Sequence, residues 1–172
     1  MRRILLVAAL AMSAAANAAS LLDGFWFAVN DNVMGGVSRS GISIGGGRMV
    51  FSGHVSLENN GGFASVRREV PGLAGDAIRF RVHGDGRRYR LTASPEARST
   101  GLQYSAAFDA APGQWTTVKV LLSDMRASFR GRPLPDAPVL KAGDVRAIGF
   151  IVGDGQSGDF RLEVEQLAAA AE

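Results

Sequence analysis

Short alternations of apolar and polar residues follow one another along most of the chain. In AIRFRV (77–82), Ile78, Phe80 and Val82 alternate with two arginines. A period of two with one polar face is typical of antiparallel strands that bury a single side. The same pattern predicts strands over MVFSGHVSL (49–57), FASVRREV (63–70), RYRLTA (88–93), LQYSAAF (102–108), WTTVKVLL (115–122), AIGFIV (147–152) and FRLEVEQL (160–167).

Clusters of Gly, Pro, Asn and Asp separate these segments, and hardly any helical periodicity interrupts them. Strands at such short spacing predict an all-β fold, namely an antiparallel β-sandwich or jelly roll of about 8–10 strands. One helical turn is predicted over SDMRASF (123–129), where Ser123 is a candidate cap. The Pro-rich segment 130–138 is predicted to be a loop, and the tail after Leu167 to be frayed.

Residues 1–18 have the three-part pattern of a secretory signal peptide. A basic start precedes an apolar run from Ile4 to Met12, and small residues end at Ala18. The run is far shorter than the about 20 residues that span a bilayer, which disfavours the alternative of an N-terminal membrane anchor. We therefore expect cleavage after Ala18 and a periplasmic or secreted protein. The remainder, 19–172, has a suitable length for a single domain.

Charge and cysteine content exclude several classes of protein. The chain has 19 Lys and Arg against 16 Asp and Glu, and loss of Arg2 and Arg3 with the signal leaves 17 against 16. An excess of one positive charge argues against a dedicated nucleic-acid binder, which gathers basic residues on one face. The chain has no cysteine, so disulfides and Cys-ligated metals are excluded.

Two loops combine amide or carboxylate side chains with a glycine pair: NDNVMGGVS (30–38) and LENNGGF (57–63). Such side chains bond the nearby backbone, and glycine permits positive φ, so both segments are predicted to be tight, shaped loops. One interpretation is that they brace an edge of the sandwich. The other is that they line one site for a polar ligand or a partner. The candidate contact residues are then Asn30, Asp31, Asn32, Glu58, Asn59 and Asn60.

Two further loops, GDGRRY (84–89) and GDGQSGD (153–159), each contain an Asp-Gly pair. Asp-Gly between alternating strands is the strongest short signal for a type I′ hairpin turn, which we expect here. The alternative is a calcium site with oxygen ligands from Asp85, Asp154 and Asp159, although their spacing does not match a single calcium-binding loop. We therefore predict neither a metal site nor a cofactor.

The sequence has no motif of a known catalytic class, such as a nucleophile elbow, HExxH or a P-loop. The two histidines, His54 and His83, lie in or at the end of predicted strands, where a packing or surface role is favoured. Asp31 and Glu58 are the one carboxylate pair worth testing for glycosidase chemistry, which needs a separation of about 5–10 Å. We expect that the protein is not an enzyme.

The aromatic residues are predicted to serve the core more than a ligand. Trp26 and Trp115 have apolar or β-branched neighbours and are predicted to be buried, whereas Tyr89 and Tyr104 are predicted to be half exposed. A carbohydrate-binding module uses two or three flat, exposed rings. Nine Phe, two Trp and two Tyr leave few rings for that role.

Six motifs occur in order along the chain: NDNVMGGVS (30–38), FSGHVSLENNGGFASVR (51–67), RVHGDGRRYRL (81–91), the Trp of GQWTTVKV (113–120), FRGRPL (129–134) and IGFIVGDGQSGDFRLEV (148–164). Together they resemble the CIA30 family, the domain of the complex I intermediate-associated protein 30. The resemblance runs from about Phe25 to Leu167. It implies a galactose-binding-domain-like β-sandwich of jelly-roll type, in agreement with the strand pattern, and it implies no catalytic residues.

The resemblance also implies a role, because the mitochondrial members of the family are non-catalytic assembly factors for respiratory complex I. An exported protein would meet a different face of any respiratory complex. The leading hypothesis is therefore an exported, non-catalytic interaction or assembly module with a protein partner. The alternative is a periplasmic carbohydrate-binding module, and a third hypothesis is a glycoside-type hydrolase. Exposed Trp or Tyr side chains beside the first Asn-rich loop would favour carbohydrate binding, and a cleft lined by carboxylates would favour the hydrolase. A flat apolar patch at that end would favour a protein partner.

Overall fold

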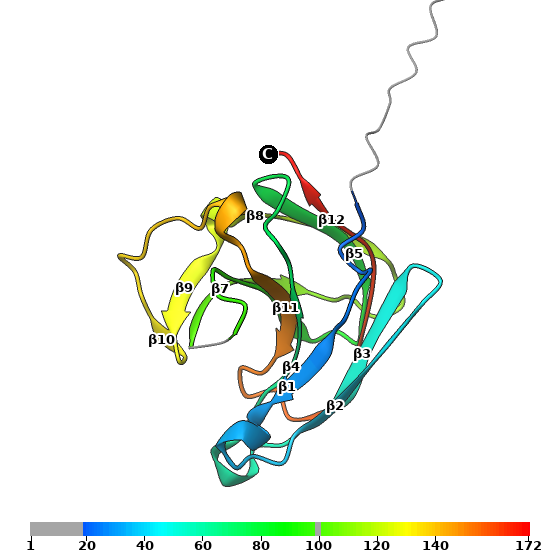
Figure 1. Cartoon of the computed structure of the whole chain (residues 1–172). Coiled ribbons are helices and arrows are strands. Elements are labelled where there is room, and N and C mark those ends of the chain that lie inside the picture. The colour runs from blue at the N-terminus through cyan, green and yellow to red at the C-terminus, as the bar shows by residue number, and fades with distance from the viewer. Residues whose placement is uncertain (1–18, 99–100) are drawn as a thin grey trace, which may run out of the picture.

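The computed structural model describes residues 19–98 and 101–172, and the predicted signal peptide, 1–18, lies outside these ranges. Two antiparallel sheets face each other (Figure 1). The first has seven strands in the order β1 (Phe27–Asn30), β4 (Ala64–Glu69), β11 (Ala147–Val152), β6 (Arg88–Ser94), β7 (Leu102–Asp109), β9 (Arg126–Phe129) and β10 (Arg132–Pro133). The second has five strands in the order β2 (Arg39–Gly45), β3 (Arg48–Val55), β12 (Gly158–Ala170), β5 (Ala77–His83) and β8 (Thr116–Leu121).

This architecture confirms the predicted all-β sandwich, with twelve strands in the described ranges. The helical elements there are four single 3-10 turns, none of them long enough to cross a membrane. They are η1 (Asp31–Met34), η2 (Glu58–Asn60), η3 (Leu122–Asp124) and η4 (Ala142–Asp144).

The facing sides of the sheets form one core, because alternate residues of each strand point inward. In β5, Ile78, Phe80 and Val82 are fully buried while the intervening arginines face outward. Phe80 packs edge to face against Phe108 and Phe150, with ring centroids 5.1 and 5.4 Å apart. Burial of each such ring contributes about 2–3 kcal/mol to folding, so this aromatic cluster is a main source of stability in a chain without disulfides.

The predicted hairpins at the two Asp-Gly loops are wrong. The segment 84–87 joins β5 to β6, and 153–157 joins β11 to β12, so each crosses from one sheet to the other. Two-residue hairpin turns occur elsewhere. Gly46-Gly47 joins β2 to β3 with φ of 58° and 73°, and Arg130-Gly131 joins β9 to β10 with φ of 49° and 81°. Both turns have the positive φ values that a type I′ turn requires.

Two smaller predictions are corrected at the ends of strands. The predicted turn over 123–129 is the 3-10 turn η3 followed by β9, since Ala127 points into the core from an extended backbone. The tail is not frayed before its last two residues: Ala168, Ala169 and Ala170 pair with β5 beyond a bulge at Gln166, whose φ is 54°.

Five connections gather at one end of the sandwich, which we call the loop end. The strand registers place the end of β1 beside the start of β4, and the end of β11 beside the starts of β4 and β6. In the other sheet the end of β3 lies beside the starts of β2 and β12. The loop end therefore holds both Asn-rich loops and both Asp-Gly loops, together with the connection from β7 to β8.

Candidate functional site

Asp31 joins the two Asn-rich loops. Its side chain is completely buried, and its carboxylate accepts hydrogen bonds from the N–H groups of Ser38 (3.0 Å), Gly62 (2.7 Å) and Phe63 (3.3 Å), and from the Ser38 hydroxyl. Burial alone would raise the pKa of Asp31, but these hydrogen bonds outweigh it and hold the pKa below its usual value. The carboxylate is thus an ionised brace.

Close packing around this carboxylate explains two glycines. A Cβ at Gly36 would lie 2.4 Å from Asp31 Cγ, and a Cβ at Gly61 would lie 2.5 Å from Asp31 Oδ2. Neither glycine has positive φ, so the requirement is for space. Gly35 differs, because its φ is 91° and nothing lies near its Cβ position. The loop therefore needs glycine for two separate reasons.

Of the six candidate contact residues, two are buried. Asn30 lies beside Asp31, and its Oδ1 accepts hydrogen bonds from the Ser40 hydroxyl (2.7 Å) and the Ser65 N–H (3.3 Å). The other four, Asn32, Glu58, Asn59 and Asn60, are exposed. Because Asp31 bonds both loops, the structure brings them side by side at the loop end (Figure 1). A ligand-binding role for the exposed four stays a prediction.

Four exposed apolar side chains accompany these polar residues. Val33 and Met34 on η1 are 71% and 67% exposed, Val37 is 42% exposed, and Leu57 is 50% exposed. Val37 and Leu57 flank the contact in which the Ser38 hydroxyl accepts the Ser56 N–H at 2.9 Å. We call these four residues the apolar rim. The sequence contains these apolar residues within both polar loops, but it does not indicate that their side chains are exposed together.

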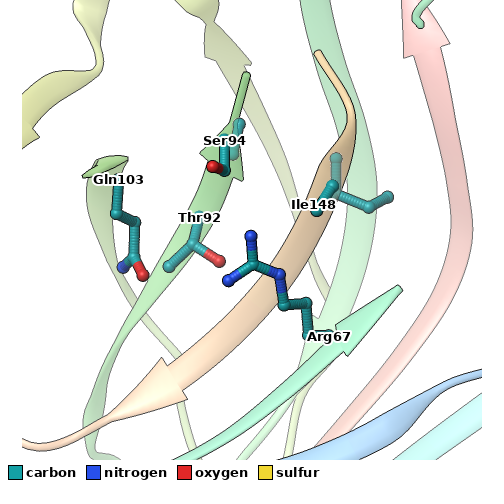
Figure 2. Close-up of a pocket in the computed structure, with 7 residues that line it drawn as sticks. Arg67, Thr92, Ser94, Gln103 and Ile148 are labelled. Atoms are coloured by element: carbon teal, nitrogen blue, oxygen red, sulfur yellow. The ribbon is translucent and has the colours of Figure 1, made fainter. Parts of the chain in front are cut away.

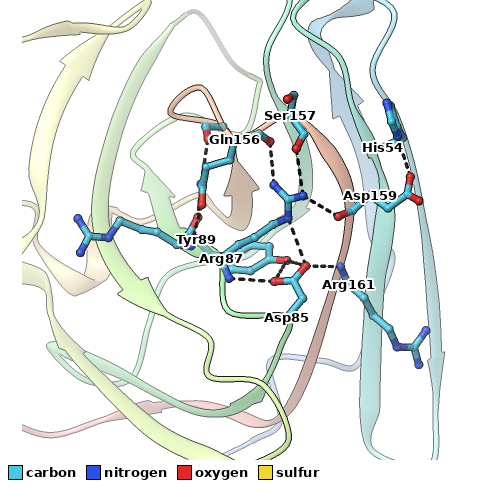
Figure 3. Close-up of polar contacts among 10 residues, drawn as sticks. His54, Asp85, Arg87, Tyr89, Gln156, Ser157, Asp159 and Arg161 are labelled. Carbon is cyan, nitrogen blue, oxygen red and sulfur yellow. Dashed lines mark hydrogen bonds and ion pairs between the residues drawn. The ribbon is translucent and has the colours of Figure 1, made fainter.

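The two Asp-Gly loops bind each other (Figure 3). The Arg87 guanidinium donates hydrogen bonds to the carbonyls of Gln156 (3.1 Å), Ser157 (3.0 Å) and Asp159 (2.8 Å). Asp85 accepts from the Tyr89 hydroxyl at 3.0 Å and from the Arg161 N–H at 2.8 Å. Burial, and secondly the Asp85 charge, raise the pKa of Tyr89 well above its ordinary value. This network links the two sheets, and its polar groups are used in these internal hydrogen bonds.

The Asp-Gly loops do not assemble the calcium site considered from the sequence. Asp154 pairs with Arg90 at 3.0 Å, Asp159 pairs with His54 at 2.7 Å, and Asp85 belongs to the network above. No group of three or more His, Asp or Glu side chains in the described ranges is arranged to hold a metal ion.

The two carboxylates considered for glycosidase chemistry, Asp31 and Glu58, lie in different environments. Asp31 is buried and its carboxylate accepts four hydrogen bonds, whereas Glu58 lies exposed on η2. A buried carboxylate held in its ionised form by backbone N–H groups is poorly suited to transfer a proton to a substrate. The pair therefore does not form a glycosidase site.

A small cavity lies on the outer face of the seven-stranded sheet. Figure 2 shows Arg67 reaching from β4 across β11 towards Thr92 of β6, with Ser94 and Gln103 nearby. Arg67 donates to the Glu96 carbonyl at 3.0 Å, while its buried Nε has no partner in the described ranges. The cavity volume is about 10 Å³. That is room for about one water and excludes an organic ligand.

The predictions for the aromatic residues are partly corrected. Trp26 is buried as expected, but Tyr89 and Tyr104 are buried too. Trp115 is only half-buried and lies on the outer face of the five-stranded sheet. The guanidinium carbons of Arg48 and Arg81 lie 4.8 and 5.5 Å from its ring centre. Both arginines pair with Glu165 of β12, so the ring covers an ion-pair network.

Comparison with known proteins identifies the family. The family described as "Complex I intermediate-associated protein 30 (CIA30)" matches residues 15–164, which is most of the chain. The chain belongs to the CIA30 family. None of the curated protein sequences compared with it matches.

Solved structures with a similar fold include carbohydrate-binding modules. The family 11 module of the cellulosomal cellulase Lic26A-Cel5E of Clostridium thermocellum has a TM-score of 0.62 and 18% identity, over 87% of this chain and 92% of that one. The family 11 module from the same organism in complex with a beta-1,3-1,4-mixed-linked tetrasaccharide has a TM-score of 0.61 and 18% identity, over 87% of this chain and 93% of that one. A structure titled "CBM4 structure and function" has a TM-score of 0.50 and 15% identity, over 83% of this chain and 84% of that one. At these identities the CIA30 chain shares their fold.

Proposed function

We propose that this CIA30 protein is an exported, non-catalytic binding module that holds a protein partner at its loop end. The apolar rim carries this proposal: Val33, Met34, Val37 and Leu57 are between 42% and 71% exposed on two adjacent loops. Apolar side chains gathered on one exposed site, with polar residues around them, are typical of protein interaction surfaces.

Hydrogen bonds beneath the apolar rim hold its two loops together, which favours a binding role. Asp31, Ser38 and Gly62 hold both loops in one conformation through buried hydrogen bonds. A preorganised surface loses little entropy when a partner docks. The exposed Asn32, Glu58, Asn59 and Asn60 lie on the same two loops as the apolar residues and offer hydrogen-bonding groups for an interface. An assembly role also agrees with the description of the family.

Site-specific crosslinking tests the proposal. A photo-reactive residue at position 34 should yield a discrete crosslinked protein in the native cell envelope. Position 139 is the matched control, because Val139 is 62% exposed outside the apolar rim. Met34→Lys combined with Val37→Lys should abolish the partner's recovery and leave the melting temperature unchanged. Equal adducts at both positions, or none at 34, would contradict the proposal.

A second candidate function is carbohydrate binding, favoured by the fold shared with the two Clostridium thermocellum modules. In this chain the one tryptophan outside the core is Trp115, on the five-stranded sheet. Affinity electrophoresis in gels containing mixed-linked β-glucan tests this function. Retardation that is lost in Trp115→Ala and kept in Met34→Lys would establish sugar binding; the protein-partner proposal expects no retardation.

A further inference from the structure

An open groove of about 450 Å³ lies at the side of the sandwich, away from the apolar rim. It runs between β8, which forms one edge of the five-stranded sheet, and the strands β6, β7 and β9 of the other sheet. The lining residues are Arg90, Ser105, Ala106, Ala107, Lys119, Val120, Asp124 and Arg126. Small side chains from β7 form much of its wall, so a ligand can approach the backbone of that strand.

The edge of β7 along this groove is uncovered. β9 pairs with β7 only from Leu102 to Ser105, and no strand in the described ranges pairs with that edge from Ala106 to Asp109. The Ala127 carbonyl accepts a hydrogen bond from the Leu134 N–H, so it faces away from β7. In the neighbouring residue of β9, Arg126, the backbone N–H and C=O groups therefore face Ser105 of β7. Because alternate residues face the same side, the N–H and C=O groups of Ala107 face the groove.

Two of the cations that line this groove, Lys119 and Arg126, have no acidic partner in the described ranges. Lys119 of β8 lies directly opposite Arg79 of β5, and neither is paired with an acid in the described ranges. Arg126 is also exposed and unpaired there. Like charges directly opposite each other on neighbouring strands are destabilising. Among the other lining residues, Arg90 pairs with Asp154, and Asp124 is the only acid.

We propose that this groove binds an acidic peptide segment in extended conformation, which adds as a short strand to the edge of β7. The unpaired N–H and C=O groups of Ala107 would bond the peptide backbone, and Lys119 and Arg126 would pair with its carboxylates. An acidic polysaccharide is less well matched, because no lining residue is aromatic and the uncovered edge presents backbone groups. This site is separate from the apolar rim and does not depend on it.

Fluorescence anisotropy with labelled peptides tests the proposal on the full chain. The probe is a six-residue peptide that alternates Glu and Val, with an alternating Gln and Val peptide as the neutral control. The acidic peptide should bind saturably and at least about tenfold more tightly than the neutral one. Two isomers, N-methylated at the odd or at the even positions, examine the strand pairing. One isomer should lose binding and the other keep it, because alternate N–H groups face β7.

Charge variants locate the site. Arg126→Ala and Lys119→Glu should each weaken binding of the acidic peptide by about tenfold. Arg39→Ala is the matched control, because Arg39 is exposed on β2, at the opposite edge of the five-stranded sheet, and has no acidic partner in the part of the chain that the structure describes. Lys119→Glu should also raise the melting temperature, since it replaces the repulsion from Arg79 with attraction.

Three results would overturn the proposal. One is no saturable binding of the acidic peptide. Another is equal binding by both N-methylated isomers, which would mean a charge contact without strand addition. The third is saturable binding of polygalacturonate that depends on Arg126 while the peptide does not bind, which would identify the groove as a site for acidic polysaccharide.

Discussion

Two neighbouring residues of the first Asn-rich loop, Asp31 and Asn32, are expected to contribute differently to stability. Asp31→Ala should lower the free energy of unfolding by about 3 kcal/mol, because it leaves the N–H groups of Ser38, Gly62 and Phe63 without an acceptor in a buried site. Asn32→Ala should change it by less than about 0.5 kcal/mol, since its side chain is exposed. Urea denaturation of both variants checks this. Similar losses in the two would show that Asp31 is not the brace.

The ionisation of Asp31 gives stability a pH dependence. Its pKa is lower in the folded protein than the ordinary value of 3.8, so the unfolded chain takes up a proton first as pH falls. The stabilisation is complete above about pH 5 and decreases below it. Asp31→Asn should be less stable at neutral pH and should lose less stability between about pH 4 and 2.5. Urea midpoints across that range provide the measurement, and parallel curves for both proteins would contradict it.

At the scale of elements, period-two alternation predicted the strands because burial on one face dictates it. β5 and β12 show this, with Phe80 and Leu162 inward and arginines outward. The hairpins predicted at the Asp-Gly loops are wrong because the dipeptide favours a tight turn and carries no information about which strand the chain joins next. The apolar rim and the bond from Asp31 to Gly62 depend on contacts between residues far apart in sequence, which local patterns do not contain.

The contact between the two Asn-rich loops predicts coupling between them. Gly61→Ala should be strongly destabilising, because its Cβ would clash with Asp31 Oδ2. In an Asp31→Ala background the same substitution should cost at least about 1 kcal/mol less, since the clashing oxygen is gone. A double-mutant cycle by urea denaturation measures this difference. Additive effects would mean that the two loops do not meet at Asp31.

The Asp-Gly loops allow a matched comparison of adjacent arginines. Arg87→Ala removes hydrogen bonds to three carbonyls of the opposite loop and should lower stability by about 2 kcal/mol. Arg88→Ala removes an exposed ion pair with Asp109 and should cost less than about 0.5 kcal/mol. Thermal melts separate these outcomes. An equal loss in both variants would show that the Arg87 contacts do not fasten the sheets.

At the scale of the whole molecule, this CIA30 chain and the carbohydrate-binding modules share one sandwich at 18% identity or less, so the fold leaves the ligand open. On its own sandwich this chain has an apolar rim at the loop end, a basic groove beside β7, and a half-buried tryptophan next to two arginines. Each surface has its own test, and none requires the others.

Export is a proposal about the whole chain, with the predicted cleavage after Ala18. Ser20 pairs with Ala168, and the Leu21 N–H donates to the Leu167 carbonyl at 2.8 Å, so the chain is fastened to β12 directly after the proposed cleavage site. Removal of 1–18 should leave these contacts intact. Envelope-fraction protein should begin at Ala19 on N-terminal sequencing and should melt at the same temperature as the full chain. Recovery of intact Met1 in a membrane pellet would show instead that the segment remains as an anchor.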